Sequence, residues 1–450
     1  MSTHPTPSRT RPHNSRPVYL VDGLRTPQLK ARGVPGPFQA ADLALAAGRA
    51  LLLRQPFAPR DLDEVILGCV SSGPDEANIA RIVSLRLGCG PGVTAWTVQR
   101  NCASGMQALD CAAKDIALGR ADLVLAGGTE AMSHHPVLLN PAMVEWLVGF
   151  NRARPLPARL RALIRLRPTH LKPIFALARG LTDPVVGLSM GQTTEELATR
   201  FDIGRAAMDA FAQESHRRLA RAQANGTLDA ELVPLYAGDH CLERDDGVRP
   251  DTSLEQLARL SPVFDRTHGR VTAGNSAQVS DGAACMLLAS ESALERHGLK
   301  PRARILDVAW AGLDPAQMGL GPAYAIARLL GRHGWDTDSI DAWEINEAFA
   351  GQVLACLQAL TNPAFCRAEL GREAPFAPIA PERLNPDGGG IALGHPVGTS
   401  GARIVWHLVR VLEARGARRG IASLCIGGGQ GGALLLERTD ADTRDLEEAT

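Results

Sequence analysis

One local pattern occurs twice in this chain of 450 residues, once in each half. In the first half, a segment of small residues around Cys102 leads into a helical pattern and then into an apolar run that ends in Gly127-Gly128. In the second half, a glycine-rich segment around His395 leads into another helical pattern and then into a run that ends in Gly427-Gly428. This spaced correspondence indicates an internal duplication, and it predicts a site at the junction of the two halves.

Short apolar runs alternate with helical patterns along both halves. The runs begin at Val18, Glu64, Asp122 and Met286 in the first half, and at Arg304, Ala342, Ile421 and Ala433 in the second. Alternation of this kind is typical of an α/β architecture with layered sheets. Residues 133–262 interrupt it, because they are mostly helical and include an amphipathic helix at 204–224. We interpret residues 133–262 as an inserted loop domain.

Composition and charge exclude several classes of protein. The 48 basic and 48 acidic residues balance, which argues against a nucleic-acid partner, and no apolar run approaches the ~18 residues that span a bilayer. The nine cysteines form no CxxC pair, so neither a metal site nor a disulfide scaffold is expected. Residues 1–16 lack both an amphipathic period and a secretory apolar core, so we interpret them as a flexible leader and expect a cytoplasmic protein.

Residues 385–403 carry the strongest signal of a site. They place six glycines around His395, and glycine allows backbone to approach a ligand closely. An apolar helical pattern follows at once (Ile404, Val405, Leu408, Val409), so the segment leads into a helix N-terminus, which favours negative charge. An isolated histidine in such a loop has roughly even odds of a structural role.

Three further segments favour a catalytic over a structural role for His395. They are Gln-Arg-Asn-Cys102-Ala-Ser-Gly, Glu-Ile-Asn346-Glu347-Ala-Phe-Ala and Ser-Leu-Cys425-Ile-Gly427-Gly-Gly. Together with the His395 segment they resemble the four signature blocks of the thiolase family, in that family's order. The resemblance extends over most of the chain. It implies a duplicated α/β thiolase fold with a five-layer α-β-α-β-α core, and an inserted loop domain that covers the active site and holds coenzyme A.

The expected domain boundaries follow from this resemblance. We expect an N-terminal half at residues 17–132 and 263–295, a loop domain at 133–262, a C-terminal half at 296–438, and flexible tails at 1–16 and 439–450.

The first three blocks predict a nucleophile and its base. Cys102 precedes a helical pattern, and a thiol at a helix N-terminus has a lowered pKa, so its attacking thiolate form is favoured. The resemblance implies that Cys102 carries the acyl group as a thioester. It also implies that His395 activates this thiol and donates to the thioester oxygen of acetyl-CoA, together with a water held by Asn346. Glu347 is expected to support the site.

The fourth block predicts the second half of the chemistry. The resemblance implies that Cys425 removes the α-proton of acetyl-CoA in condensation, or returns a proton to the enolate in cleavage. The N–H groups of Gly427 and Cys102 are expected to form the second oxyanion hole. Ketoacyl-ACP synthases and HMG-CoA synthases share the fold, but Cys425 argues against both.

Contacts to coenzyme A are predicted in two places. Asn275 and Ser276 match the family's block near the pantetheine, although the order here is Asn-Ser-Ala-Gln where many members have Asn-Ala-Ser-Gly. A serine in such a turn otherwise bonds only to backbone. Met190 lies where short-chain members carry an aromatic or histidine-containing loop, which favours longer acyl chains. Coenzyme A is expected as a substrate, with no permanently bound cofactor and no metal.

Residues 140–180 depart most from small thiolases. They contain eight basic residues and one acidic residue, a net charge of 8 − 1 = +7 in a chain whose total is zero. Apolar residues recur at helical spacing around Trp146, and basic helices with an apolar face are typical of membrane-surface or partner-binding elements. Ordinary solvated helices are the alternative. The insertion resembles that of the thiolase β-subunit of the trifunctional fatty-acid oxidation complex, which implies an anionic membrane surface or a hydratase/dehydrogenase subunit as partner.

The sequence therefore predicts a 3-ketoacyl-CoA thiolase of fatty-acid β-oxidation. It would act on acyl-CoA, acetyl-CoA and CoA, as a homodimer or tetramer, in the cytoplasm or peripherally on the inner membrane surface. A short-chain acetyl-CoA C-acetyltransferase is the first alternative. A catalytically silent lipid carrier or scaffold is the second, although such a relative would have no chemical need for the whole set of reactive residues.

Overall fold

Ten strands form one continuous mixed sheet in the computed structural model, which describes residues 16–439. The strands of the N-terminal half are β1 (Tyr19–Arg25), β2 (Leu29–Lys30), β3 (Glu64–Gly68), β4 (Thr94–Val98), β5 (Leu123–Ala131) and β10 (Ser280–Ala289). Those of the C-terminal half are β11 (Ala303–Gly312), β12 (Ala342–Ile345), β13 (Arg419–Ile426) and β14 (Gln430–Arg438). Their order is β12-β13-β14-β11-β1-β10-β5-β3-β4, with β2 beside β10. The two halves join where β1 pairs with β11 at Leu20 and Ala303.

Alternation along the strands separates three hydrophobic cores. In β10, Cys285 and Leu287 face one core, whereas Met286 and Leu288 face the next, because successive side chains of a strand point to opposite faces. In β14, Leu434 and Leu436 share that second core, and Leu435 belongs to a third. Both halves of the sheet are therefore covered on both faces.

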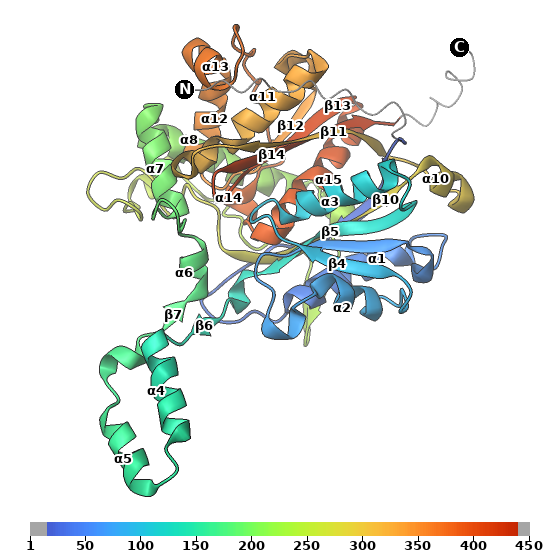
Figure 1. The fold of residues 1–450 in the computed structure, drawn as a ribbon. Coiled ribbons are helices and arrows are strands. Elements are labelled where there is room, and N and C mark those ends of the chain that lie inside the picture. The colour runs from blue at the N-terminus through green and yellow to red at the C-terminus, as the bar shows by residue number, and fades with distance from the viewer. Residues whose placement is uncertain (1–15, 440–450) are drawn as a thin grey trace, which may run out of the picture.

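Helices fill these three cores and complete five layers (Figure 1). The outer layer of the N-terminal half contains α1 (Ala40–Leu53) and α2 (Ile79–Arg86), the middle layer α3 (Ser104–Ala117) and α15 (Val397–Arg415), and the outer layer of the C-terminal half α11 (Gly321–His333) and α12 (Ala350–Thr361). The predicted α-β-α-β-α architecture is confirmed. The repeated order α3-β5 and α15-β13 also confirms the duplication, with both helices in the shared middle layer.

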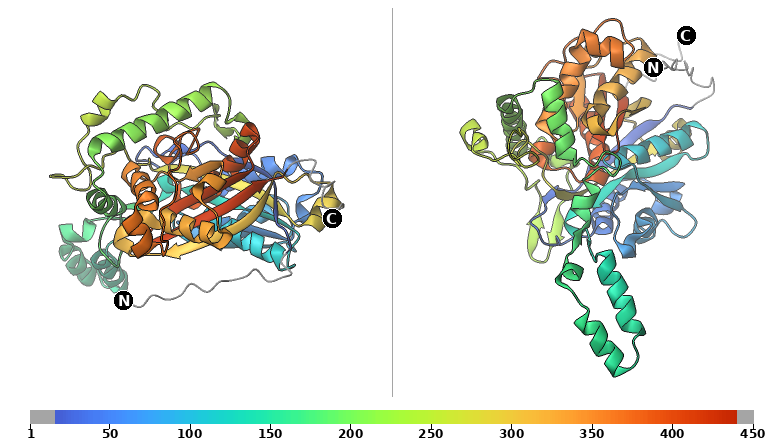
Figure 2. Two further views of the ribbon diagram at one scale, coloured as in Figure 1. Left: turned by 90° about the horizontal axis from the view of Figure 1, so that it is seen from above. Right: turned by 60° about the vertical axis from the view of Figure 1, so that its left-hand side comes forward.

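The segment between β5 and β10, inserted within the N-terminal half, carries most of the remaining helices. It contains β6 (Val137–Leu138), α4 (Pro141–Arg152), α5 (Leu156–Ile164), β7 (Ile174–Phe175), α6 (Ala176–Gly180), α7 (Met190–Arg200), α8 (Arg205–Ala224), β8 (Leu235–Ala237), β9 (His240–Leu242) and α9 (Leu254–Ala258). The helix predicted at 204–224 is α8, which has Gly204 as its N-cap. Figures 1 and 2 show that α7 and α8 lie against the body, whereas α4 and α5 project from it as a hairpin.

Three short helices complete the chain, α10 (Glu291–His297), α13 (Pro363–Glu369) and α14 (Gly390–Leu393). The predicted tails lie outside the described residues, except for their inner ends. Arg16 pairs with Asp122 at 2.9 Å, and the Thr439 hydroxyl donates to the carbonyl of Pro301 at 2.6 Å. No helix within residues 16–439 has the length and apolar character needed to cross a membrane.

A buried charge cluster ties the intervening segment to both halves. Arg25, at the end of β1, donates to Glu231 at 2.6 Å and to Asp245 at 2.7 Å. The other oxygen of Glu231 lies 2.9 Å from Nδ1 of His407 on α15. Burial disfavours both charges, but the carboxylates raise the pKa of His407 to about 10, and Arg25 and His407 lower the pKa of Glu231. Both groups are therefore charged at neutral pH.

Candidate active site

Cys102 lies in the turn between β4 and α3, two residues before the helix begins. The Ser104 hydroxyl closes this turn, since it accepts from the N–H of Arg100 at 2.8 Å and donates to the carbonyl of Asn101 at 2.7 Å. Asn101 has a φ of 44°, a left-handed conformation that non-glycine residues seldom adopt. Its side-chain amide donates to the carbonyl of Gly427 at 2.8 Å, so the Cys102 turn is bonded to the glycine turn after β13.

The pKa of Cys102 differs from the sequence-based expectation. Burial raises the pKa of this thiol above its ordinary value, the N–H groups of Gly427 and of Cys102 itself lower it, and repulsion from Glu130 raises it further. The prediction of a lowered pKa was wrong for this structure, because it considered the helix start and not the burial. The thiol therefore needs a base to accept its proton. The two N–H groups predicted to form an oxyanion hole both face this sulfur.

His395 lies at the end of the glycine-rich loop, immediately before α15, and is 8% exposed. Its backbone N–H donates to the carbonyl of Gln278 at 3.0 Å, and its Nδ1 lies 2.6 Å from Oγ of Ser400. The Ser400 hydroxyl lies 3.1 Å from the carbonyl of Pro396 and can donate its proton there. Nδ1–H then donates to Ser400, and Nε2 keeps a lone pair.

Two features keep a lone pair of His395 available to accept a proton. Its Nε2 is buried and has no hydrogen-bond partner among the described residues. Burial lowers the pKa of its imidazole to about 4, and the positive charge of Arg403 lowers it further. The side chain is therefore neutral at physiological pH, and its Nε2 remains available as an acceptor.

Asn346 follows β12 directly and meets His395. Its side-chain Nδ2 lies 3.4 Å from Nδ1 of His395, and its backbone N–H donates to the carbonyl of Ser423 at 2.9 Å. Its side-chain Oδ1 is buried and has no partner among the described residues. Two contacting residues that each keep a buried acceptor without a partner are unusual in a folded interior, and they indicate a position for a water or a ligand oxygen.

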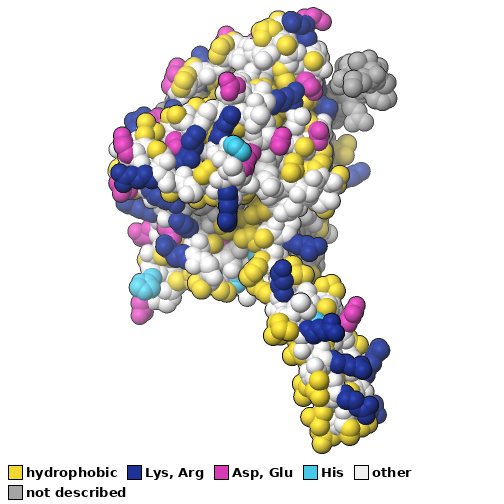
Figure 3. Space-filling model, turned by 90° about the vertical axis from the view of Figure 1, so that its left-hand side faces the viewer, with side chains coloured by type: hydrophobic (Ala, Val, Ile, Leu, Met, Phe, Trp, Pro, Cys, Tyr) yellow, Lys and Arg dark blue, Asp and Glu magenta, His cyan; other side chains and the backbone are white. Residues whose placement is uncertain are grey.

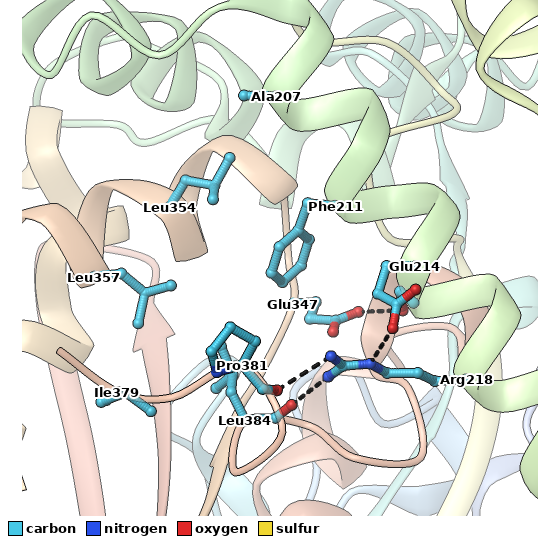
Figure 4. A pocket seen from close by; sticks show the side chains of 11 residues that line it. Ala207, Phe211, Glu214, Arg218, Glu347, Leu354, Leu357, Ile379, Pro381 and Leu384 are labelled. Atoms are coloured by element: carbon cyan, nitrogen blue, oxygen red, sulfur yellow. Dashed lines mark hydrogen bonds and ion pairs between the residues drawn. The ribbon is translucent and has the colours of Figure 1, made fainter.

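Glu347 bonds to α8 and to the loop that precedes His395. Its carboxylate accepts from the Ser215 hydroxyl at 2.6 Å, from the Asn385 amide at 2.8 Å and from the N–H of Ile391 at 3.3 Å. It also lines a pocket of about 310 Å³ between α8 and α12, whose other walls are largely apolar (Figure 4). Burial raises the pKa of Glu347 despite these three donors. Glu347 thus anchors the loop that carries His395.

Cys425 lies near the end of β13 and is 1% exposed. It packs in an apolar cluster with Met318 and Ala348, flanked by Met190 and Phe349. Burial raises the pKa of its thiol well above the ordinary value, and repulsion from Cys102 and Cys356 adds to the increase. The thiol is therefore protonated at rest, which is the state that can give a proton to a carbanion.

Gly427 is the first residue after β13, in a turn where Gly428 and Gly429 have φ values of 86° and 74°. Met190 lies at the N-terminus of α7, and its sulfur is 3.5 Å from the position that a Cβ of Gly427 would take. The structure therefore brings Cys102, Gly427 and Met190 together, and it places Met190 in the apolar wall beside Cys425.

The predicted coenzyme A contacts lie in the turn that precedes β10. Asn275 is fully buried, and its side chain bonds to Asp209 at 2.9 Å, to the carbonyl of Arg270 at 3.1 Å and to the N–H of Thr272 at 2.8 Å. The hydroxyl of Ser276 donates to the carbonyl of Thr272 at 2.7 Å and retains its acceptor lone pairs. Asn275 has no exposed side-chain atom for a ligand in this structure. No three metal-binding side chains are grouped to hold an ion within residues 16–439.

Two family descriptions match almost the whole chain. Residues 18–292 match the thiolase N-terminal domain, and residues 299–438 match the thiolase C-terminal domain. The chain belongs to the thiolase family. Members of this family are acyltransferases that act on coenzyme A thioesters, so the predicted enzyme class is confirmed.

Individual relatives cover this thiolase nearly end to end. A β-ketoadipyl-CoA thiolase of Pseudomonas aeruginosa is 42% identical over 430 residues, which are 94% of this chain and 100% of that protein. The mitochondrial 3-ketoacyl-CoA thiolase of Rattus norvegicus is 37% identical over 94% of this chain and 99% of its own length. The crystal structure of human mitochondrial 3-ketoacyl-CoA thiolase in complex with CoA superposes with a TM-score of 0.81, at 35% identity, over 94% of this chain and 98% of that one.

Several groups around the site of this thiolase were not anticipated from the sequence. Glu130, at the end of β5, accepts from the N–H groups of Val70, Ser71 and Gly398 at 2.9 to 3.0 Å, and burial raises its pKa to about 7. It joins the N-terminal half to the start of α15. The only sign of Glu130 in the sequence was an acid in an otherwise apolar strand. No feature of the sequence indicated a role for Ser400.

Proposed function

We propose that this thiolase cleaves a 3-ketoacyl-CoA with CoA to give acyl-CoA and acetyl-CoA through an acyl-enzyme on Cys102. His395 Nε2 takes the proton of Cys102, and the thiolate attacks the keto carbon. The bond between the keto carbon and the α-carbon then breaks, and the electron pair passes to the enolate of acetyl-CoA. Cys425 protonates this enolate, so that acetyl-CoA leaves and the acyl group remains on Cys102.

The second half of the proposed reaction restores the enzyme. The thiol of CoA gives its proton to the Cys425 thiolate and attacks the thioester carbon. Cys102 leaves as a thiolate and recovers its proton from the His395 imidazolium. The N–H groups of Cys102 and Gly427 would stabilise the oxyanion on the acyl carbon, and His395 with a water on Asn346 would stabilise the thioester enolate. The observation that supports this most is the pair of unpartnered buried atoms, Nε2 of His395 and Oδ1 of Asn346.

The proposed acyl substrate is an aliphatic chain. Four apolar side chains pack around Cys425: Met190, Met318, Ala348 and Phe349. A terminal carboxylate buried in such a wall without a cation would cost several kcal/mol. We therefore place this thiolase in fatty-acid β-oxidation, with acetoacetyl-CoA as the short end of its range.

A second candidate substrate is 3-ketoadipyl-CoA. It is favoured by the relative from Pseudomonas aeruginosa, which is described as a β-ketoadipyl-CoA thiolase and is 42% identical. The two candidates differ in one group, the terminal carboxylate of the acyl chain.

Thiolysis of matched substrates separates the two candidates. We expect kcat/KM to be at least about tenfold higher for 3-ketohexanoyl-CoA than for 3-ketoadipyl-CoA, which has the same number of carbons, because one unpaired buried charge costs more than 1.4 kcal/mol. Longer 3-ketoacyl-CoAs extend the series. A higher kcat/KM for 3-ketoadipyl-CoA would replace the aliphatic assignment with the dicarboxylic one.

The remaining parts of the proposal concern coenzyme A and the setting of the enzyme. We propose that Ser276 contacts the pantetheine through its free lone pairs and that Asn275 holds the turn. We further propose a homodimer or tetramer in the cytoplasm, where all nine cysteines stay reduced, as they are in this structure. A hydratase/dehydrogenase subunit is the proposed protein partner.

A further inference from the structure

The projecting hairpin, residues 137–180, differs from the rest of the surface in its apolar exposure. Of the twenty large apolar side chains exposed among the described residues, eleven belong to this segment: Val137, Leu138, Leu139, Val144, Val148, Leu156, Leu160, Leu163, Ile164, Leu171 and Phe175. Leu156 and Ile164, at the two ends of α5, are 71% and 83% exposed. An apolar concentration of this size on a soluble surface marks an interaction site.

The charges of the hairpin are also unpaired. Its eight basic residues are Arg152, Arg154, Arg159, Arg161, Arg165, Arg167, Lys172 and Arg179, against the single acid Glu145. None of these cations forms an ion pair with a carboxylate of residues 16–439, although arginines elsewhere commonly do. The hairpin therefore presents a net charge of +7 without a carboxylate partner among residues 16–439.

Internal contacts hold the two helices of the hairpin together. The Trp146 indole stacks on Phe150 at 5.3 Å and donates to the carbonyl of Ala162 at 2.8 Å, which fixes α4 against α5. The side-chain amide of Asn140 donates to the carbonyls of Thr169, His170 and Lys172 at 2.8 to 3.0 Å, which closes the base. The exposed apolar side chains are therefore presented by a preformed element, and binding requires little ordering.

We propose that this hairpin docks on an anionic lipid surface. Figure 3 shows apolar side chains over the end of the hairpin and along one edge, with basic side chains along the other edge. A bilayer interface accepts apolar side chains around a tip while anionic headgroups meet the cations beside it. A second copy of the chain would bring another charge of +7 against the first.

The docking surface is separate from the reactive groups. No side chain of residues 140–172 contacts Cys102, His395, Asn346 or Cys425, so lipid binding and thiolysis can be measured independently. The inference consequently does not depend on the proposed reaction. A loss of vesicle binding with normal thiolysis, or the reverse, identifies which of the two proposals fails.

The test is co-sedimentation of the full chain with vesicles. We expect binding to vesicles of phosphatidylcholine with phosphatidylglycerol, little binding to phosphatidylcholine alone, and weakening by salt, since exposed charges are screened. The triple variant Arg161→Gln/Arg165→Gln/Arg167→Gln should bind about 100-fold more weakly, as three basic residues each contribute about fivefold near an anionic surface. The double variant Leu156→Ser/Ile164→Ser should also bind more weakly, with the salt dependence retained.

A matched control removes three exposed arginines from other parts of the surface. Arg60→Gln/Arg259→Gln/Arg266→Gln lowers the net charge equally and should leave vesicle binding almost unchanged. All variants should keep the thermal stability of the wild type and its rate on a short 3-ketoacyl-CoA. Equal binding by the hairpin triple variant and the wild type would overturn the proposal. So would the absence of wild-type binding to phosphatidylglycerol vesicles, or a loss of self-association in the hairpin variants without any change in lipid binding.

Discussion

The imidazole Nδ1 of His395 lies 2.6 Å from the hydroxyl oxygen of Ser400, which is on the first turn of α15. The loop that carries the proposed base and the helix that follows it are therefore locked together by one short hydrogen bond. Because this bond assigns the proton to Nδ1, it leaves Nε2 free to accept.

Removing the Ser400 hydroxyl should disorient the base. We expect Ser400→Ala to lower kcat by about 100-fold with little change in KM, because small misplacements of a reacting group cost about this much. Ser400→Thr keeps the hydroxyl and should recover much of the rate. Steady-state kinetics of both variants test this, and an unchanged kcat in Ser400→Ala would show that the bond is dispensable.

The acid limb of the pH profile should lie well below the ordinary range of histidine. The folded pKa of His395 is lowered to about 4, so the neutral base is present above that pH and is lost as pH falls through it. We therefore expect kcat/KM to stay nearly constant as the pH is lowered through 6.5. The measurement is kcat/KM against pH, with circular dichroism at each pH to verify folding. An acid limb centred near 6.5 would show that His395 is not held neutral.

Cys425 should be needed for carbon–carbon chemistry but not for acyl transfer to Cys102. Cys425→Ala should lose condensation of acetyl-CoA by about 10²–10⁴-fold, the usual contribution of a general acid or base. It should still accept an acyl group from acyl-CoA. Cys356→Ala is a matched control, since Cys356 is also buried and close to Cys425. Comparable condensation rates in the two variants would remove Cys425 from the reaction.

The buried cluster around Glu231 should dominate the electrostatic contribution to stability. We expect Glu231→Gln to lower the free energy of unfolding by about 3–5 kcal/mol, because Arg25 and His407 would keep buried charges without their partner. Asp115→Asn removes an exposed pair with Arg120 and should cost no more than about 1 kcal/mol. Urea unfolding measures both.

The cluster around Glu231 should also make the free energy of unfolding depend on pH. The folded pKa of Glu231 is lowered, so its stabilisation is present above the unfolded value of 4.5 and is lost as pH falls below it. The folded pKa of His407 is raised to about 10, so its stabilisation is present below the unfolded value of 6.5 and is lost as pH rises through 10. The stability difference between wild type and Glu231→Gln should therefore shrink below pH 4.5. A constant difference down to pH 3 would contradict the assignment.

Local patterns in the sequence were sufficient for most of the fold. Each predicted apolar run is part of a strand, because apolar alternation and β-branched residues are visible within a few residues of sequence. The α8 helix begins and ends close to its predicted limits. The α4 and α5 helices also followed from spacing. Their projection away from the body did not, since the sequence does not show which apolar face lacks a partner.

The site was predicted only as far as its residue types. The meeting of Cys102, Asn346, His395 and Cys425 was inferred from the resemblance to thiolases, since three-dimensional contacts across 300 residues leave no local signal. The pKa of Cys102 was predicted in the wrong direction because burial is a property of the folded chain. Glu130 binds backbone N–H groups that are distant in the sequence. Ser400 binds His395, and the sequence did not show the path of the loop between them.

The central claim is that Cys102 carries the acyl group. Peptide mass spectrometry after acid quenching of a reaction with 3-ketohexanoyl-CoA measures this directly. We predict a butanoyl thioester on the Cys102 peptide, because cleavage of the six-carbon chain releases two carbons as acetyl-CoA. It should appear in both the wild type and controls that keep Cys102, such as Cys356→Ala. Cys102→Ser should show no thioester and no turnover. A thioester on Cys425, or unchanged labelling in Cys102→Ser, would contradict the account.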